Sequence, residues 1–261
     1  MKTVVHSLSK DFETINIYVL ADAHIGSPNC NYKQIKKLID TVASEPNNFL
    51  ILNGDLIDNA IIGGKSDVYT QMMTPTEQVE VAVKLLEPVK DKILCSVQGN
   101  HEARSYKTVG VDLSKLIMIE LFGIQRTEEL YTDKTMLLFV EFGRNYGRDN
   151  RKTIYSLYIT HGFGGGSTVG SKANRLEKMS NLANADVFIH SHTHLPLVFK
   201  QAVSNVDYRN KKLNTKVALF VNTNAFLSGG SYAEVWLLKT PSIDFPHITL
   251  SGFERDVQAT L

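Results

Sequence analysis

Short apolar runs that each end in a cluster of metal-ligating side chains constrain the fold of this chain more than any other feature. The clusters are Asp22-Ala23-His24, Gly54-Asp55, Gly99-Asn100-His101-Glu102, His161-Gly162 and His192-Thr193-His194. Four follow runs that read as buried strands, at residues 17–20, 49–52, 93–97 and 155–159, and the fifth follows residues 187–189. Ligands of open α/β sheets bind at the carboxyl ends of the strands, so we expect the clusters to converge on one site.

The first half of the chain alternates predicted strands with predicted helices. Residues 31–44 have apolar side chains at a helical spacing, and a further helix is expected over residues 112–122. Between them, Thr74-Pro75-Thr76-Glu77 predicts a helix start, with a threonine cap, a proline in the first turn and a glutamate three residues after the cap. This helix should end before Pro88. The alternation implies a largely parallel sheet.

The second half has a different pattern. Apolar runs at residues 136–140 and 155–159 are separated by a polar turn, which predicts a hairpin. A helix is expected over residues 171–183, and further strands at residues 187–189, 197–200, 217–221, 233–238 and 247–250. Two mixed sheets packed face to face, with helices on both outer faces, would fit this order. We expect one domain over residues 1–261, because the five clusters need a shared sheet.

The composition is that of an ordinary globular enzyme, with 43% hydrophobic and 21% charged residues. The formal net charge of +1 gives no global attraction to nucleic acid or to an anionic membrane. Cys30 and Cys95 provide no disulfide framework, which fits a reducing cytosol. The N-terminal residues lack the apolar core of a signal peptide, and no apolar run approaches membrane-spanning length. We expect a soluble, cytoplasmic protein without a membrane partner, and the sequence leaves its oligomeric state open.

The five clusters, in this order, resemble the calcineurin-like metallophosphoesterase superfamily, whose pattern runs D-x-H, G-D, G-N-H-[DE], H and G-H-x-H. Each piece alone is a weak indication, whereas the ordered set is specific. The resemblance spans the chain from Asp22 to His194 and implies an α/β fold, a four-layer αββα sandwich of two mixed sheets flanked by helices. Ser191 departs from the pattern, because the family usually has glycine there. Serine is small, so we expect the turn to survive.

The resemblance implies seven metal ligands. Asp22, His24 and His194 would bind the first metal, Asp55 would bridge both metals, and Asn100, His161 and His192 would complete the second. A bridging carboxylate offsets the repulsion between two dications about 3.5–4 Å apart. Imidazole suits manganese, iron, zinc or nickel better than magnesium or calcium. We therefore expect two divalent metal ions, manganese first, with iron, zinc or nickel as alternatives.

The resemblance also implies a catalyst that is not a ligand. His101 would donate a proton to the leaving alkoxide while a hydroxide held between the metals attacks phosphorus. Glu102 would orient His101 or, alternatively, form a surface salt bridge. His190 lies outside the family pattern, and we expect it to support the site without binding a metal. Taken singly, Asp22 and Asn100 could instead cap turns.

Four cations are candidates for binding the substrate phosphate: Arg104, Lys107, Lys172 and Arg175. The first two follow His101, and the other two share a helical face after the glycine-rich segment 162–168. The alternative for that helix is a solvated face. Phe163 could stack on a base or anchor its loop in the core. We expect Asp58 to support the second cluster rather than to bind metal.

The function predicted from these residues is that of a dinuclear metal-dependent phosphoesterase. Within this class, a phosphodiesterase acting on nucleotides or nucleic acid is favoured. The first alternative is a phosphomonoesterase or phosphoprotein phosphatase. Phosphoprotein phosphatases continue the second cluster with Asp-Arg-Gly, whereas this chain has Asp58-Asn59-Ala60. The second alternative is a non-catalytic scaffold of the same fold, against which the intact ligand set and His101 argue.

Overall fold

Two six-stranded β-sheets form the centre of the computed structural model, which describes residues 1–62, 64, 66–164, 168–228 and 245–260. In spatial order, the first sheet contains β1 (Lys2–Ser7), β6 (Thr135–Asn145), β7 (Arg151–Thr160), β8 (Val187–His190), β10 (Lys212–Asn222) and β9 (Leu197–Asp207). The second contains β12 (Val257–Thr260), β11 (His247–Ser251), β2 (Thr14–Leu20), β3 (Asn48–Asn53), β4 (Ile93–Val97) and β5 (Tyr131–Thr132). Each sheet has parallel and antiparallel pairs, so the prediction of two mixed sheets is confirmed.

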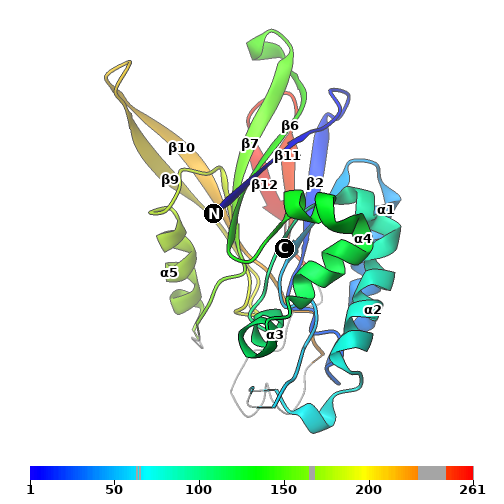
Figure 1. Cartoon of the computed structure of the whole chain (residues 1–261). Helices are drawn as coiled ribbons and strands as arrows, with labels where there is room; N and C mark the ends of the chain where they lie inside the picture. The colour runs from blue at the N-terminus through cyan, green and yellow to red at the C-terminus, as the bar shows by residue number, and fades with distance from the viewer. Residues whose placement is uncertain (63, 65, 165–167, 229–244, 261) are drawn as a thin grey trace.

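Helices cover the outer faces of both sheets. The α-helices of the described chain are α1 (Tyr32–Ser44), α2 (Pro75–Leu86), α3 (Glu102–Val109), α4 (Leu113–Leu130) and α5 (Val169–Met179). The 3-10 turns are η1 (Val68–Thr70), η2 (Glu87–Lys92) and η3 (Tyr146–Arg148). Figure 1 shows α1, α2 and α4 on the side of the second sheet and α5 beside β9 and β10. The layers are therefore helix, sheet, sheet and helix, which confirms the predicted αββα sandwich.

The helix starts follow from local sequence. The Asn31 side chain accepts a hydrogen bond from the backbone of Gln34 and caps α1, whose apolar side chains from Ile35 to Val42 are buried at the predicted spacing. Thr74 and Glu77 form the predicted capping box at the start of α2, and Pro75 occupies the first turn. The helix ends at Leu86, before Pro88, as predicted.

Other element boundaries differ from the predictions. The fourth helix, α4, continues to Leu130 through a kink at Gly123, where φ is +75°, and so runs past the predicted end at residue 122. Thr168 caps α5, which begins earlier than predicted and ends at Met179 rather than at residue 183. The sequence did not indicate β1, β5, β12 or α3, which are short and lack a sustained period. The strand predicted at residues 233–238 lies outside the described residues.

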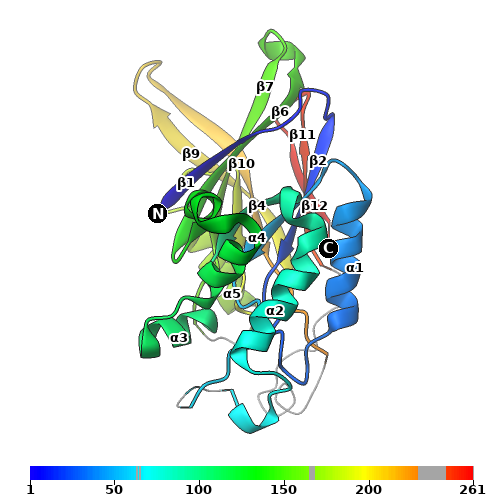
Figure 2. The same cartoon turned by 45° about the vertical axis from the view of Figure 1, so that its right-hand side comes forward.

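The topology brings the carboxyl ends of five strands together. In the second sheet β2, β3 and β4 are parallel neighbours, and in the first sheet β7 and β8 are parallel neighbours. The amide of Asn53, the last residue of β3, donates a hydrogen bond to the carbonyl of Thr160, the last residue of β7 (2.9 Å). This contact ties the two sheets where their polar clusters begin. The turns of the β6–β7 and β9–β10 hairpins lie at the opposite end of the molecule from α3 (Figures 1 and 2).

Membrane-spanning helices are not found in the described part of the chain, because none of its helices has the length and apolar character to cross a bilayer.

Candidate metal centre

Backbone strain is concentrated on the predicted metal ligands. Five of the seven have left-handed backbone angles, with φ of 51° at Asp22, 47° at His24, 51° at Asp55, 67° at His192 and 54° at His194. Non-glycine residues adopt this region rarely and persist there only where the surrounding structure holds them, typically at functional sites. The turns after β2, β3 and β8 therefore aim these side chains at a stability cost.

Two glycines allow the second and third clusters to meet backbone to backbone. A Cβ on Gly99 would overlap the Asp55 amide, and one on Gly54 would overlap Gly99. Both motifs therefore need glycine at these positions because of the close approach.

Serine is accepted at position 191 because it is not the strained residue of its turn. His192, not Ser191, has the positive φ. The Ser191 hydroxyl accepts hydrogen bonds from the Asn53 amide (2.7 Å) and the Thr223 hydroxyl (2.8 Å), and the residue is fully buried. The turn survives the departure from the family pattern, as predicted.

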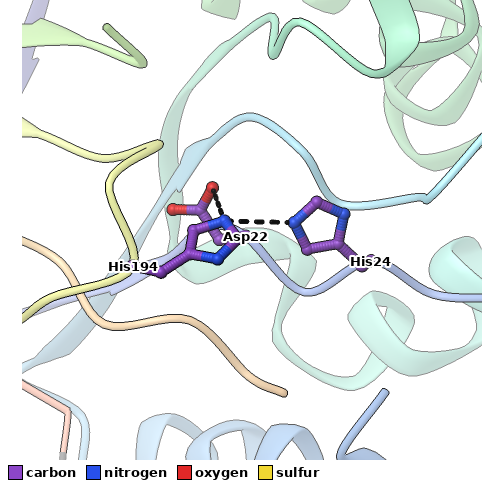
Figure 3. A group of neighbouring side chains, drawn as sticks. All are labelled: Asp22, His24 and His194. Atoms are coloured by element: carbon purple, nitrogen blue, oxygen red, sulfur yellow. Dashed lines mark hydrogen bonds and ion pairs between the residues drawn. The ribbon is translucent and has the colours of Figure 1, made fainter. Parts of the chain in front are cut away.

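Asp22, His24 and His194 form the first group of candidate ligands, and their ligand atoms lie within 4.8 Å of one another. His194 Nε2 lies 3.2 Å from Asp22 Oδ1 and 3.3 Å from His24 Nε2 (Figure 3). Two imidazole nitrogens and one carboxylate oxygen from two separate turns, those after β2 and β8, thus point toward one another (Figure 3).

Asp55, His161 and His192 form the second group. His161 Nε2 lies 3.2 Å from Asp55 Oδ2 and 3.1 Å from the side-chain oxygen of Asn100. His192 Nδ1 is buried and has no hydrogen-bond partner among the described residues. The two groups adjoin, because the His192 backbone N–H donates to Asp22 Oδ2 (2.9 Å). All seven predicted ligands therefore lie in one place.

Hydrogen bonds to the outer nitrogen fix two of the rings. His161 Nδ1 donates to the Asn53 carbonyl (2.7 Å), and His24 Nδ1 donates to Asp58 Oδ1 (3.2 Å). Such partners set the tautomer and leave Nε2 free for a metal. Asp58 Oδ1 also lies 3.2 Å from His101 Nδ1, so it contacts both rings, and His24, Asp58 and His101 form a further group whose ligand atoms lie within 4.8 Å of one another.

Burial and mutual contacts shift the pKa values of the candidate ligands in the site without metal. Burial raises the pKa of Asp55, but His161 and His101 outweigh this effect and hold the pKa well below its ordinary value. Burial lowers the pKa of His161, but Asp55 outweighs it and raises the pKa to about 10. Burial and the charge of His161 lower the pKa of His192 to about 4. A buried carboxylate, an unpartnered neutral imidazole and convergent nitrogen and oxygen donors fit a divalent transition metal.

His101 sits beside the two groups. Its backbone N–H donates to Asp55 Oδ1 (2.8 Å), and its Nδ1 donates to the Asp58 carbonyl (2.7 Å). Arg104 Nη2 lies 2.8 Å from the other ring nitrogen, Nε2, which is also 3.8 Å from Asp55 Oδ2. Burial lowers the pKa of His101, but Asp58 and Asp55 more than offset this effect, so the pKa lies above its ordinary value.

Glu102 is fully buried, which contradicts the alternative that it forms a surface salt bridge. Its carboxylate accepts hydrogen bonds from three consecutive backbone N–H groups, those of Asp55 (3.1 Å), Leu56 (2.6 Å) and Ile57 (3.2 Å). Burial and the charge of Asp55 raise the pKa of Glu102 to about 7. The residue holds the turn that presents Asp55, rather than the ring of His101.

His190 is buried behind the ligands. Its Nδ1 bonds to the side-chain oxygen of Asn222 (2.9 Å), and its ring packs where a Cβ on Gly162 would lie. The glycine after His161 therefore makes room for this ring.

The four predicted phosphate-binding cations differ in their surroundings. Arg104 contacts His101 and donates to Ser66 Oγ (3.0 Å), and Lys107 is exposed on the same helix. Lys172 is buried and donates to the Thr193 carbonyl (2.6 Å), so its part of α5 is not a solvated face. The Arg175 guanidinium packs against Gly164. Residues 165–167 of the glycine-rich segment lie outside the described residues.

Sequence reasoning missed a layer of amides behind the site. Asn59, fully buried with φ of 43°, donates from its side chain to the His101 carbonyl (2.7 Å). Gln78 accepts from the Asn59 backbone (2.9 Å), and Gln71 donates to Asp58 Oδ2 (2.7 Å). The position of Asn59, four residues after Asp55, was the one indication in the sequence, since asparagine tolerates left-handed angles.

Comparison with solved structures finds distant likenesses. A conserved uncharacterized protein of Streptococcus pneumoniae TIGR4, described as a predicted phosphoesterase, shares 11% identity with a TM-score of 0.39, over 94% of this chain and 88% of that one. A double mutant of Vps29 from Entamoeba histolytica shares 10% with a TM-score of 0.41, over 94% and 97% of the two chains. The Haemophilus influenzae NAD nucleotidase shares 12% with a TM-score of 0.40, over 95% and 49%. Likenesses this weak carry no argument about function.

The comparison with protein families is decisive, whereas no curated protein matches the chain. The family model for calcineurin-like phosphoesterases matches residues 15–196, which include the seven predicted ligands and His101. This family comprises metal-dependent hydrolases, and the Asp and His groups described above are suited to divalent metals. The chain therefore belongs to the calcineurin-like phosphoesterase family.

Proposed function

We propose that this chain is a dinuclear metal-dependent phosphodiesterase that acts on nucleotides or nucleic acid, within one domain of residues 1–261. The observation that carries the proposal is the adjacency of the two ligand groups, Asp22-His24-His194 and Asp55-His161-His192, joined by the hydrogen bond from His192 to Asp22. One group alone would indicate a mononuclear site, whereas two adjoining groups suit a pair of metals.

The residues divide into two metal sites. Asp22, His24 and His194 would hold one ion, Asn100, His161 and His192 would hold the other, and Asp55 would contact both. When bound, the metals supply Lewis acidity, which activates water and neutralises charge on the phosphoryl oxygens. Manganese is the first candidate, because the donors are mainly imidazole and carboxylate.

Two side chains of the protein, His101 and Arg104, are proposed to act on the leaving group and the phosphate. As the bond from water oxygen to phosphorus forms and the bond to the leaving oxygen breaks, that oxygen needs a proton. His101 would donate it from Nε2 of the protonated ring, once Arg104 has turned away from this nitrogen, because Nδ1 donates to the Asp58 carbonyl. Arg104 already reaches Nε2, so its guanidinium is placed to turn to a phosphate oxygen when substrate binds.

The diester preference is supported by the absence of the Asp-Arg-Gly sequence of phosphoprotein phosphatases. The residue in the arginine position is Asn59, whose side chain holds the His101 carbonyl instead of facing a substrate. That arrangement removes one phosphate-binding cation from the site. A lower positive charge suits a diester, which carries one negative charge fewer than a fully ionised monoester.

The test is hydrolysis of bis-nitrophenyl phosphate and of nitrophenyl phosphate in the presence of manganese. We expect the diester to be the better substrate and Asp55→Asn to abolish its hydrolysis. The matched control is Asp11→Asn, which changes an exposed carboxylate paired with Arg144 and should leave the rate unchanged. Preference for the monoester would favour a phosphomonoesterase, and no hydrolysis with any divalent metal would favour a scaffold.

A further inference from the structure

Tyr69 is a solvent-exposed aromatic residue on a segment that is fixed to the candidate metal centre. Its side chain is 98% exposed, although the backbone around it is held on both sides. Ser66 accepts a hydrogen bond from Arg104 (3.0 Å), and Gln71 donates to Asp58 (2.7 Å). The Asp67 side chain caps the turn by accepting from the Tyr69 backbone N–H (2.9 Å). The ring is therefore presented to solvent by an anchored turn next to His24 and its partner Asp58.

Phe163 has the same character on the side of His161. It lies two residues after His161 and is 79% exposed, so the alternative that it anchors its loop in the core is wrong. The glycines on either side have φ of 93° and 90° and pack against the His190 ring and the Arg175 guanidinium. The backbone at Phe163 is thus packed against the buried His190 and the half-buried Arg175 while the ring remains in solvent.

Tyr69 and Phe163 differ from the other exposed apolar residues because their segments are tied to the loops that carry the candidate ligands. An aromatic ring in solvent offers a flat apolar face on which a base can stack. Tyr69 lies two residues before Gln71, which bonds to Asp58, the partner of His24, and Phe163 lies two residues after His161. A cation contacts each of the two segments: Arg104 bonds to Ser66, and the Arg175 guanidinium packs against Gly164.

We propose that Tyr69 and Phe163 are stacking platforms for the two bases that flank the scissile phosphate of a single-stranded nucleic acid. This inference rests on the proposed phosphodiesterase function and names its substrate class. A phosphodiester held across both ligand groups would direct one nucleoside toward the segment of Tyr69 and the other toward the segment of Phe163. Stacking on aromatic side chains, with cations along the backbone, is how single strands bind without sequence preference. A paired duplex hides the base faces that these rings would contact.

Binding is measured by fluorescence anisotropy with manganese-loaded protein on a His101→Gln background, which slows hydrolysis during the measurement. The probes are an oligothymidylate about eight nucleotides long and an abasic oligomer of the same length. Tyr69→Ala and Phe163→Ala should each weaken binding of the oligothymidylate about tenfold or more and leave binding of the abasic oligomer unchanged. Tyr69→Trp and Phe163→Trp should restore binding, because tryptophan also stacks. The matched control is Tyr208→Ala, which removes a tyrosine that is 87% exposed in the β9–β10 turn.

Equal binding of the two oligomers, or loss of binding in only one of the two alanine variants, would overturn the two-base assignment. An effect of Tyr208→Ala as large as the others would also overturn it. These results are separable from the proposed function. Hydrolysis of bis-nitrophenyl phosphate without base-dependent binding would reject the stacking platforms alone. Base-dependent binding without hydrolysis of any diester would reject the phosphodiesterase and leave a nucleic-acid-binding site.

Discussion

The carboxylate of Glu102 accepts a hydrogen bond from the backbone N–H of Asp55 at 3.1 Å. The last residue of the third cluster therefore holds the turn that carries Asp55 in the second. Two further N–H groups, those of Leu56 and Ile57, bond to the same carboxylate. Because Asp55 is the residue proposed to contact both metals, the geometry of the dinuclear site depends on a side chain that is not itself a ligand.

Glu102→Gln is expected to weaken metal binding by roughly 10–100-fold, the usual effect of losing a group that orients a ligand. A glutamine has one acceptor oxygen for three N–H donors, and its amide N–H₂ would face one of them. Manganese affinity is measured by isothermal titration, with Glu120→Gln on the exposed face of α4 as the control. Unchanged affinity in Glu102→Gln would reduce the residue to a packing role.

His101→Gln is expected to keep both metals and to lose far more rate on a diester with a poor leaving group than on a nitrophenyl diester. An alkoxide needs a proton in the transition state, whereas nitrophenolate leaves unaided. The expected loss on an alkyl or nucleotide diester is roughly 10²–10⁴-fold. Equal losses on both substrates would show that His101 stabilises charge instead, and loss of a metal would make it a ligand.

Metal binding is expected to release about one proton from His161 between pH 7 and 9. The pKa of this ring is about 10 in the metal-free protein, above its ordinary value of 6.5, and ligation requires the neutral ring. The same shift means that the His161–Asp55 pair stabilises the metal-free fold fully below pH 6.5, and that this contribution is lost as the pH rises through 10. Calorimetric titrations of manganese into the protein, carried out in buffers of different ionisation enthalpy, measure the number of protons released. Identical heats in all buffers at pH 8 would contradict the assignment, and His161→Asn should abolish the release.

Lys172→Met is expected to lower the free energy of unfolding by about 1–3 kcal/mol, because the buried Thr193 carbonyl loses its charged donor. The side chain holds the turn between His192 and His194, so manganese affinity should fall as well. Lys178→Met, an exposed position on the same helix, is the control for charge and should change neither quantity. A rise in KM with unchanged stability would return Lys172 to the phosphate-binding role.

Strand ends and helix starts could be predicted because they depend on local sequence. The apolar runs before Asp22 and Asp55 give strands that end where the sequence indicates, and the capping box at Thr74 is complete within four residues. The convergence of the clusters followed from a general property of parallel strands.

Burial of charged side chains could not be predicted, because tertiary contacts decide it. Glu102 is buried because three backbone N–H groups of a turn distant in sequence donate to its carboxylate. Lys172 is buried because its ammonium group donates to the Thr193 carbonyl. In a single sequence both read as ordinary polar residues on short helices. The kink at Gly123 and the strand β1, which pairs with a partner more than a hundred residues away, likewise have no local pattern.

A dinuclear site is tested by counting the manganese ions bound per chain as metal is added to metal-free protein, with diester hydrolysis measured in the same samples. We expect two ions per chain, activity that rises only as the second ion binds, and at most one tightly bound ion with no activity in Asp55→Asn. Full activity with one ion per chain, or two tightly bound ions in Asp55→Asn, would contradict this expectation.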